Sequence, residues 1–304
     1  MAERWKIIAN PRAGGGLGIK QRNRLEVAFQ AQDIDASWLI SDELSRLQTL
    51  IEEALQEGFR QFVSVGGDGS LHHLVNALCA QQLVPTQELT IGVIPLGTGN
   101  DWIKTHRIPR RLEQAVRVLT FGQRFYQDIG LIQYQGENGP EQRFFCNVAG
   151  SGFEAEVVRR SRDMDKSGLK GTFVYLSLVL KTLFSYQSQV HSGDEAAPES
   201  ALLHSLGICR YNGGGMQLVP EAVPDDGLFD VTQIKALKPW EVIVNLAKLY
   251  NGKLYRHPKV RHERLSEYHL EGQEPIAIEA DGEFLGHTPA QFSILPTALG
   301  FMRP

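Results

Sequence analysis

The sequence lacks the features that mark several specialised classes of protein. It has three cysteines, Cys79, Cys146 and Cys209, which lie far apart and without paired spacing. This usage predicts neither a disulfide framework nor a zinc site, and it fits a reducing compartment. Long hydrophobic runs are also missing. The most apolar segment, 171–186, contains Lys181 and is shorter than the roughly 20 residues of a membrane span, so we expect a soluble protein.

An excess of charge of one sign is absent as well. The chain has 31 Lys and Arg against 35 Asp and Glu, a net charge of −4, whereas a nucleic-acid-binding protein usually has a basic excess. We therefore expect no nucleic-acid partner. The apolar run after Lys6 ends at Asn10-Pro11, too early for a secretory signal, so we expect a cytoplasmic location. The 304 residues, 42% of them hydrophobic, favour two globular domains.

The first third of the chain alternates two patterns. Short apolar segments predict strands at 5–9, 37–40, 62–65 and 89–94, and polar-apolar periodicity predicts helices at 19–30, 41–58, 70–81 and 112–119. Strands that alternate with helices of about 10–15 residues indicate a parallel sheet covered by helices. Residues 1–125 are therefore predicted to form an α/β domain with a parallel sheet.

After about residue 125 the pattern becomes β-rich. Segments typical of antiparallel strands lie at 125–133, 143–149, 203–211, 228–235, 261–269, 276–281 and 291–295. We predict helices over about 169–186 and from Pro239 to Tyr250. Residues 126–304 are therefore predicted to form a β-rich antiparallel domain, with the last residues returning to the first domain.

Three glycine-rich segments each follow a predicted strand. They are NPRAGGG at 10–16, GGDGS at 66–70 and PLGTGND at 95–101. The carboxyl ends of parallel strands share one edge of a sheet, where glycine lets backbone N–H groups approach phosphate oxygens. One such turn alone is also typical of a plain strand-to-helix connection. Three in succession predict a shared phosphate site.

The common phosphate-binding motifs do not account for this site. No G-x-G-x-x-G follows the first strand, which disfavours dinucleotide binding, and no P-loop ending in Gly-Lys-Ser/Thr is present. The three turns in this order instead resemble the catalytic domain of the diacylglycerol kinase family. The chain is most similar to its bacterial soluble lipid kinases, which share their fold with sphingosine kinases and NAD kinases.

Further motifs extend the resemblance over nearly the whole chain. They are NVAGSGF from Asn147, GGGM from Gly213, PDDG from Pro224 and DGE from Asp281. The resemblance implies an NAD kinase-like fold for the N-terminal α/β domain and a sandwich for the C-terminal β-rich domain.

The resemblance also implies that ATP is held by the turns of the first domain. The nucleotide-binding residues would be Asn10, Arg12, Ser41, Gly66, Gly67, Asp68, Gly69, Ser70 and Thr98. Ser70 stands where the family commonly has Thr, so the hydroxyl is retained. His72-His73 replaces the family's usual Asn-Glu, which leaves nucleotide and substrate preference open.

Phosphoryl transfer requires Mg²⁺, an aligned hydroxyl and a proton acceptor. The candidate carboxylates are Asp68, Asp101, Asp281 and Glu283. By resemblance the Asp281-Gly282-Glu283 turn provides the base, and the sequence leaves open which carboxylate acts; Asp-Gly is also typical of a plain hairpin turn.

A structural Mg²⁺ site is implied by the resemblance in the second domain. Its ligands would be the Asp226 carboxylate and the backbone carbonyls of Val223 and Leu228. Oxygen ligands of this kind suit Mg²⁺.

The sequence thus predicts an ATP- and Mg-dependent lipid kinase of diacylglycerol or a related lipid alcohol. We expect it to be cytoplasmic and transiently at the inner membrane surface. A basic stretch before the segment 171–186 indicates either contact with an anionic membrane or the solvated approach to a packed helix; it comprises Arg159, Arg160, Arg162, Lys166 and Lys170. The alternatives are a kinase of a soluble acceptor, as in NAD kinases, and a non-catalytic nucleotide- or lipid-binding protein. A homodimer is left open.

Overall fold

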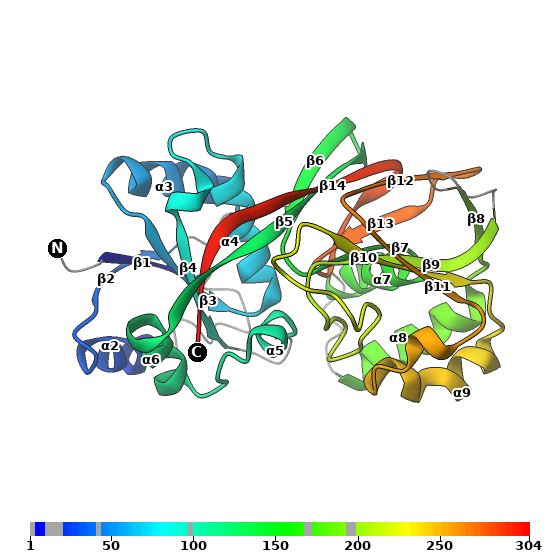
Figure 1. The fold of residues 1–304 in the computed structure, drawn as a ribbon, viewed down its shortest axis with the longest axis horizontal. Helices are drawn as coiled ribbons and strands as arrows, with labels where there is room; N and C mark the ends of the chain where they lie inside the picture. The colour runs from blue at the N-terminus through cyan, green and yellow to red at the C-terminus, as the bar shows by residue number, and fades with distance from the viewer. Residues whose placement is uncertain (1–3, 10–20, 41–43, 97–99, 167–171, 193–198) are drawn as a thin grey trace. The chain divides into compact units, whose positions relative to one another are not determined.

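The computed structural model describes residues 4–9, 21–40, 44–96, 100–166, 172–192 and 199–304 (Figure 1). The chain divides into two compact units. Unit 1 consists of Met1–Ile129 and Leu295–Pro304, and unit 2 consists of Gly130–Ile294. Two long strands, β5 (Gln123–Gly136) and β14 (Glu283–Arg303), contribute residues to both units.

Unit 1 is built on a parallel sheet. Its strands are β1 (Arg4–Ala9), β2 (Asp35–Ile40), β3 (Gln61–Gly66) and β4 (Thr90–Pro95), in the order β2-β1-β3-β4. The end of β14 joins β4 in parallel through Gly300 and Phe301. Every residue of β4 and all but the first of β3 are buried, as expected of strands covered by helices on both faces.

Helices cover both faces of this sheet. They are α2 (Arg22–Gln30), α3 (Leu44–Gln56), α4 (Asp68–Ala80), α5 (Trp102–His106) and α6 (Leu112–Phe121), with the 3-10 helix η2 (Thr86–Glu88). Figure 1 shows α3 and α4 on one side and α2 with α6 on the other, and each pair is in contact. In α6, Leu112, Ala115 and Leu119 recur on one face and are buried, which anchors it to the sheet.

The C-terminal segment is held in unit 1 by an aromatic cluster. The rings of Trp102, His106, Phe125 and Phe301 have centroid separations from 4.1 to 5.9 Å. The buried Trp102 indole N–H donates to Gln127 Oε1 at 3.0 Å. Burial lowers the pKa of His106 to about 3, so its ring is neutral at physiological pH and packs as an aromatic side chain.

Unit 2 is antiparallel. Besides its parts of β5 and β14, its strands are β6 (Gly139–Phe145), β7 (Val148–Gly152), β8 (Gln189–Ser192), β9 (Glu199–Gly207), β10 (Phe229–Lys235), β11 (Val260–Leu265), β12 (Glu267–Gly272) and β13 (Ala277–Ala280). The order β9-β7-β13-β14 continues from β14 through β12 and β8 back to β9, so these six strands close into a ring, and β10 and β11 extend the sheet from β9. The helices are α7 (Phe153–Lys166), α8 (Thr172–Ser185) and α9 (Pro239–Tyr250), with the 3-10 helix η3 (Leu254–Arg256).

The mixed α/β architecture is confirmed, and the described sheet as a whole is largely antiparallel because parallel pairs occur only in unit 1 among the described strands. The predicted helix Pro239–Tyr250 is also confirmed. Three predictions were wrong: Arg159, Arg160 and Arg162 belong to a helix of their own, α7, and the predicted strands 143–149 and 261–269 are each divided between two strands. Within the described ranges, no helix has the length and apolar character needed to span a bilayer.

Candidate functional site

Gly67 alone connects β3, which ends at Gly66, to α4, which begins at Asp68. The helix begins immediately, since the N–H groups of Ser70 and Leu71 bond to the Gly67 carbonyl at 3.0 and 3.2 Å. The first N–H groups of a helix have no partner within it, and the helix dipole adds partial positive charge there. The turn therefore presents the N-terminus of a 13-residue helix at the end of a buried strand, which suits a phosphate group.

Asp68 links this turn to the next one. Its carboxylate accepts hydrogen bonds from the N–H groups of Asp101, at 2.8 Å, and Trp102, at 3.3 Å. Asp101 is buried, and its Oδ1 accepts a hydrogen bond from Lys104 Nζ at 2.6 Å. Two of the predicted carboxylates are thus brought together, with Asp68 positioning the backbone at Asp101.

Some of the other predicted nucleotide-binding residues lie within the described part of the chain and some do not. Gly66 ends β3, Gly67 precedes α4, and Gly69 and Ser70 lie in the first turn of that helix. Outside the described residues lie Asn10, Arg12, Ser41 and Thr98.

The helix that follows the turn carries the unusual histidine pair. His72 is buried in α4, where its carbonyl accepts a hydrogen bond from Asn76 Nδ2 at 2.9 Å, and His73 is half-buried. The two rings meet edge to face with centroids 5.4 Å apart. His72 therefore has a packing role within unit 1.

The acidic turn connects β13 to β14 in unit 2. Asp281 and Gly282 both have positive φ, 52° and 84°, as type I′ hairpin turns require. The Asp281 carboxylate accepts hydrogen bonds from the N–H groups of Cys146, at 3.1 Å, and Asn147, at 2.9 Å. These two donors lie between β6 and β7, so the carboxylate fixes the hairpin against a distant part of the chain.

Glu283 differs from Asp281 in its surroundings. It is half-buried at the start of β14, and among the described residues no hydrogen bond or ion pair involves its side chain. Asp281 is held by backbone donors, whereas the Glu283 carboxylate retains its capacity to accept a proton or a hydrogen bond. The two candidate bases are therefore distinguishable by their contacts.

Two glutamates beside this turn, the buried Glu279 and the half-buried Glu154, were missed by the sequence analysis. Glu279, on β13, accepts a hydrogen bond from the Gly282 N–H at 2.9 Å. Glu154, at the start of α7, accepts one from Asn212 Nδ2. A Cβ atom at Gly150 would lie 2.9 Å from Glu154 Oε2 and 3.2 Å from Glu279 Oε1, so both carboxylates crowd the same glycine.

Burial raises the pKa of both carboxyl groups. It raises the pKa of Glu154 to about 7. The pKa of Glu279 is also well above its usual range, first because of burial and then because of the charge of Glu154. Asp281 and Glu283 add further negative charge around Glu279. Burial of both carboxyl groups and the negative charge around them therefore favour the protonated form of this pair near neutral pH. An acidic residue inside the buried strand AIEA was the available sequence signal.

Asp226, the predicted Mg²⁺ ligand, is engaged by other partners. Its Oδ1 accepts a hydrogen bond from the Leu228 N–H at 3.1 Å, and its Oδ2 pairs with the Arg264 guanidinium. A divalent cation at Oδ2 would have to displace Arg264, so the residues as arranged fit a metal poorly. Throughout the part of the chain that the structure describes, no group of three or more His, Cys, Asp or Glu could hold a metal ion.

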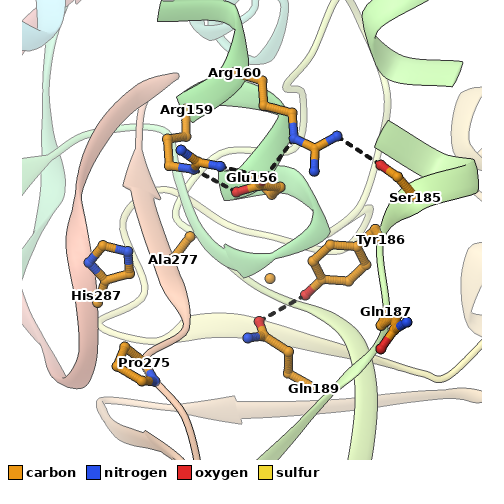
Figure 2. Close-up of a pocket in the computed structure, with 11 residues that line it drawn as sticks. Glu156, Arg159, Arg160, Ser185, Tyr186, Gln187, Gln189, Pro275, Ala277 and His287 are labelled. Atoms are coloured by element: carbon orange, nitrogen blue, oxygen red, sulfur yellow. Dashed lines mark hydrogen bonds and ion pairs between the residues drawn. The ribbon is translucent and has the colours of Figure 1, made fainter. Parts of the chain in front are cut away.

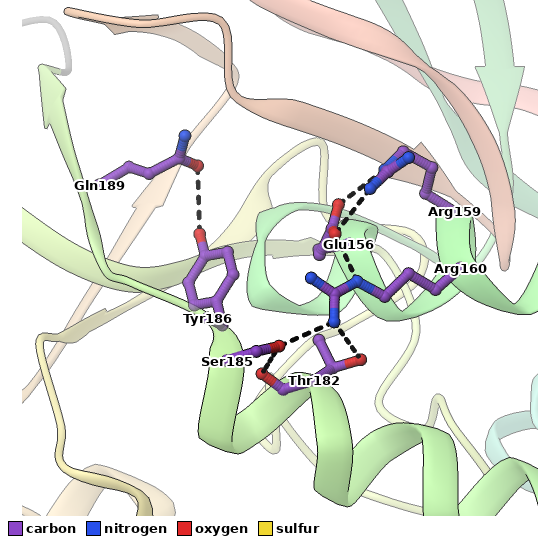
Figure 3. A network of polar contacts seen from close by, with 7 residues as sticks. All are labelled: Glu156, Arg159, Arg160, Thr182, Ser185, Tyr186 and Gln189. Carbon is purple, nitrogen blue, oxygen red and sulfur yellow. Dashed lines mark hydrogen bonds and ion pairs between the residues drawn. The ribbon is translucent and has the colours of Figure 1, made fainter.

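Unit 2 also contains a pocket of about 430 Å³ (Figure 2). Glu156 pairs with Arg159 at 2.7 Å and with Arg160 at 2.6 Å, and Arg160 reaches Ser185 Oγ at 2.8 Å (Figure 3). The Tyr186 hydroxyl donates to Gln189 Oε1 at 3.2 Å. The pocket is lined by polar groups with two guanidinium ions, which suits the oxygen atoms of an ester or a phosphate.

Unit 1 has a helix N-terminus that suits a phosphate group, and unit 2 has an acidic turn held by backbone N–H groups. Together they are typical of a phosphate-handling protein of mixed α/β architecture. Residues 4–132 match the diacylglycerol kinase catalytic domain, and residues 147–303 match the YegS C-terminal NAD kinase beta sandwich-like domain. The chain belongs to this diacylglycerol kinase family, and it is a kinase enzyme.

Individual relatives are similar over nearly their whole length. The chain is 28% identical to a diacylglycerol kinase of Staphylococcus carnosus, with 96% of this chain and 92% of the relative covered. It is 27% identical to a diacylglycerol kinase of Staphylococcus aureus, with 100% and 93% covered. A crystal structure of a diacylglycerol kinase from Bacillus anthracis has a TM-score of 0.70 at 20% identity, and covers 99% of this chain and 97% of that one. Since its identity is low, this likeness concerns the fold.

Proposed function

We propose that this chain transfers the γ-phosphoryl group of ATP to the hydroxyl of diacylglycerol or a related lipid alcohol. The observation that carries the proposal is the acidic turn, in which Asp281 is fixed by two backbone N–H groups while the neighbouring Glu283 side chain has no such bond among the described residues. The family and the curated diacylglycerol kinases similar to the chain support the choice of acceptor.

The nucleotide is proposed to bind in unit 1. The N-terminus of α4 would accept phosphate oxygens of ATP, because its first N–H groups and the helix dipole favour negative charge. Asp68 would act indirectly, by holding the backbone of Asp101 in place. Mg²⁺ bound with ATP would neutralise phosphate charge, and the buried Asp101 carboxylate is the group we assign to face it.

Glu283 is proposed as the general base. Its carboxylate would accept the proton of the acceptor hydroxyl as the hydroxyl oxygen forms a bond to the γ-phosphorus. The bond between that phosphorus and the oxygen of the β-phosphate breaks, and ADP leaves with the electron pair. Asp281 would position the turn through its bonds to Cys146 and Asn147.

The pocket of unit 2 is proposed to hold the acceptor. Arg159 and Arg160 would donate hydrogen bonds to the ester oxygens of the lipid, while Glu156 keeps the two guanidinium groups in place. Burial tends to raise the pKa of Glu156, but the adjacent arginines lower it overall, so the ion pairs persist in the neutral range.

The acceptor is tested with radiolabelled ATP, Mg²⁺ and a set of acceptors presented in detergent micelles. The set contains diacylglycerol, monoacylglycerol, sphingosine, ceramide, phosphatidylglycerol and, as a soluble acceptor, NAD. We expect label in a lipid product. Label in NAD alone would contradict the lipid assignment, and ATP binding without transfer to any acceptor would indicate a non-catalytic binding protein.

A further inference from the structure

Helix α9 lies at the edge of unit 2 (Figure 1), and many of its apolar side chains are exposed. Its exposed fractions are 60% for Trp240, 47% for Ile243, 67% for Val244, 46% for Leu246 and 52% for Tyr250. No residue of this 12-residue helix is fully buried. The outer side of a helix on a globular protein is normally polar. Five exposed apolar side chains on one helix therefore require an explanation.

The fold does not need these side chains for packing. The inward side of α9 is occupied by Val242 and Leu249, which pack against a buried cluster that includes Leu202 and Ile234. The polar positions Glu241 and Asn245 also have partners: Asn245 Nδ2 donates to the Glu241 carbonyl at 2.8 Å. The outer side chains are thus available to a partner outside the chain.

The surroundings of the helix are basic. Between Lys235 and Arg261 the one acidic residue is Glu241, and its carboxylate accepts hydrogen bonds from Lys259 Nζ and from the Lys238 N–H, both at 2.8 Å. Basic residues lie at both ends of the helix and in the segment after it; they are Lys238, Lys248, Lys253, Arg256 and Lys259. This local excess stands out in a chain of net charge −4.

The aromatic residues add a second feature. Trp240 lies in the first turn of α9 and Tyr250 at its last residue, and both are more than half exposed. Trp and Tyr rings favour the boundary between hydrocarbon and water, because each has an apolar body and a polar group. An apolar helical face with aromatic ends and basic surroundings is typical of a helix that lies flat in a membrane surface.

We propose that α9 docks this protein on a bilayer that contains anionic lipids, with Trp240, Ile243 and Val244 entering the acyl-chain boundary and the basic residues meeting the headgroups. The proposal rests on the proposed function in one respect: a lipid acceptor resides in such a bilayer. A second copy of this chain is the less suitable occupant. In a two-fold dimer through α9 the same surface faces itself, so the basic surroundings of one copy would oppose those of the other.

The basic stretch on α7 is a weaker candidate for this contact. Arg159 and Arg160 both pair with Glu156, and Arg160 also bonds to Ser185. Their charge is therefore largely paired within unit 2, whereas α9 combines exposed apolar area with basic charge.

The test compares two substitutions in the full-length chain. Val244→Asp places a charge at the centre of the proposed docking face. Val27→Asp is its matched control, because Val27 is also an exposed helical valine, at 65% against 67%, and lies on α2 in unit 1. Binding is measured by flotation with vesicles of phosphatidylglycerol and phosphatidylcholine, and with vesicles of phosphatidylcholine alone.

We expect the wild-type chain to float with the anionic vesicles and to bind the neutral ones more weakly. Val244→Asp should lower binding about tenfold or more, since a valine that enters the acyl-chain boundary is replaced by a charge, and Val27→Asp should leave it unchanged. Arg256→Gln should lower binding to anionic vesicles about fivefold. The fluorescence of Trp240 should shift to shorter wavelength on binding, and Trp240→Phe should remove that shift.

Equal flotation of the two Asp variants would overturn the proposal. So would a wild-type dimer that Val244→Asp converts to a monomer without any vesicle binding, because the face would then be a contact between protein copies. Kinase assays on a dispersed short-chain diacylglycerol separate this result from the proposed function: Val244→Asp should retain that activity, and vesicle binding can be read even if no lipid is phosphorylated.

Discussion

The Glu154–Glu279 pair, whose pKa values are raised by burial of the carboxyl groups, makes a specific prediction about the pH dependence of stability. Replacing both by glutamine keeps the size of the side chains and removes two titrating groups. Glutamine can still accept the Gly282 N–H that Glu279 accepts at 2.9 Å. The double variant therefore tests the titration of the pair with little change in packing.

The magnitude follows from the raised pKa of Glu154. A carboxyl group with a pKa of about 7 in the folded chain and 4.5 in the unfolded chain binds its proton more tightly when folded. Its contribution to the free energy of unfolding is fully present below pH 4.5 and is lost as the pH rises through about 7. At about 1.4 kcal/mol for each pKa unit, the stability lost over this pH range is about 3 kcal/mol. The raised pKa of Glu279 acts in the same direction.

The assay is urea unfolding followed by far-UV circular dichroism at several pH values from 5 to 8. As the pH rises from 5 to 8, we expect the unfolding free energy of the double variant to increase by about 3 kcal/mol relative to that of the wild-type chain. The contributions of the buried histidines cancel in the difference between the two unfolding free energies, because both proteins contain these histidines. Glu137→Gln, in the exposed β5–β6 turn, is the control and should follow the wild-type curve. If the unfolding free energies of the wild type and the double variant depended on pH in parallel, the raised pKa values of this pair would be refuted.

Other predictions follow from single contacts. Asp68→Asn should cost about 1–3 kcal/mol in unfolding free energy and weaken ATP binding measured by calorimetry, because one of two N–H groups loses its acceptor; unchanged stability would contradict this role. Arg159→Ala should raise KM for the lipid about fivefold or more with little change in kcat, and the reverse pattern would exclude it from acceptor binding. Arg264→Gln should strengthen Mg²⁺ binding at Asp226, seen as a larger Mg²⁺-dependent rise in Tm; no rise in either protein would remove Asp226 as a ligand.

The regular elements were the part that the sequence could predict. Helix α9 was predicted from Pro239 to Tyr250 because a proline at its first position and a continuous apolar pattern mark its bounds locally. The same holds for α6, which begins at Leu112 as predicted. The glycine-rich turns were also visible, because glycine and a following helical pattern are local signals.

The rest depends on partners that are distant in the sequence. Residues 143–149 form a continuous β-like pattern, but β6 ends at Phe145 and β7 begins at Val148. The N–H groups of Cys146 and Asn147 bond to Asp281 instead of a neighbouring strand. The local sequence around Cys146 and Asn147 does not indicate that a carboxylate more than 130 residues away accepts their hydrogen bonds.

Glu154 and Glu279 illustrate the same limit. Glu154 follows a glycine turn and lies in the first turn of α7, where an acidic residue is ordinary. That it meets Glu279 above Gly150 depends on the pairing of β7 with β13. Helix α7 itself was missed because its many charged residues resemble a solvated approach, although Glu156 with Arg159 and Arg160 has helical spacing.

The most direct test of the proposed chemistry is phosphoryl transfer from radiolabelled ATP to diacylglycerol by the wild-type chain and by Glu283→Gln. Glu267→Gln, an exposed carboxylate of the same unit, is the control. We predict a labelled lipid product with the wild type and the control. Glu283→Gln should lose about 100-fold or more in kcat, since a general base contributes that much, while its affinity for ATP is retained. Wild-type turnover by Glu283→Gln would contradict the central claim.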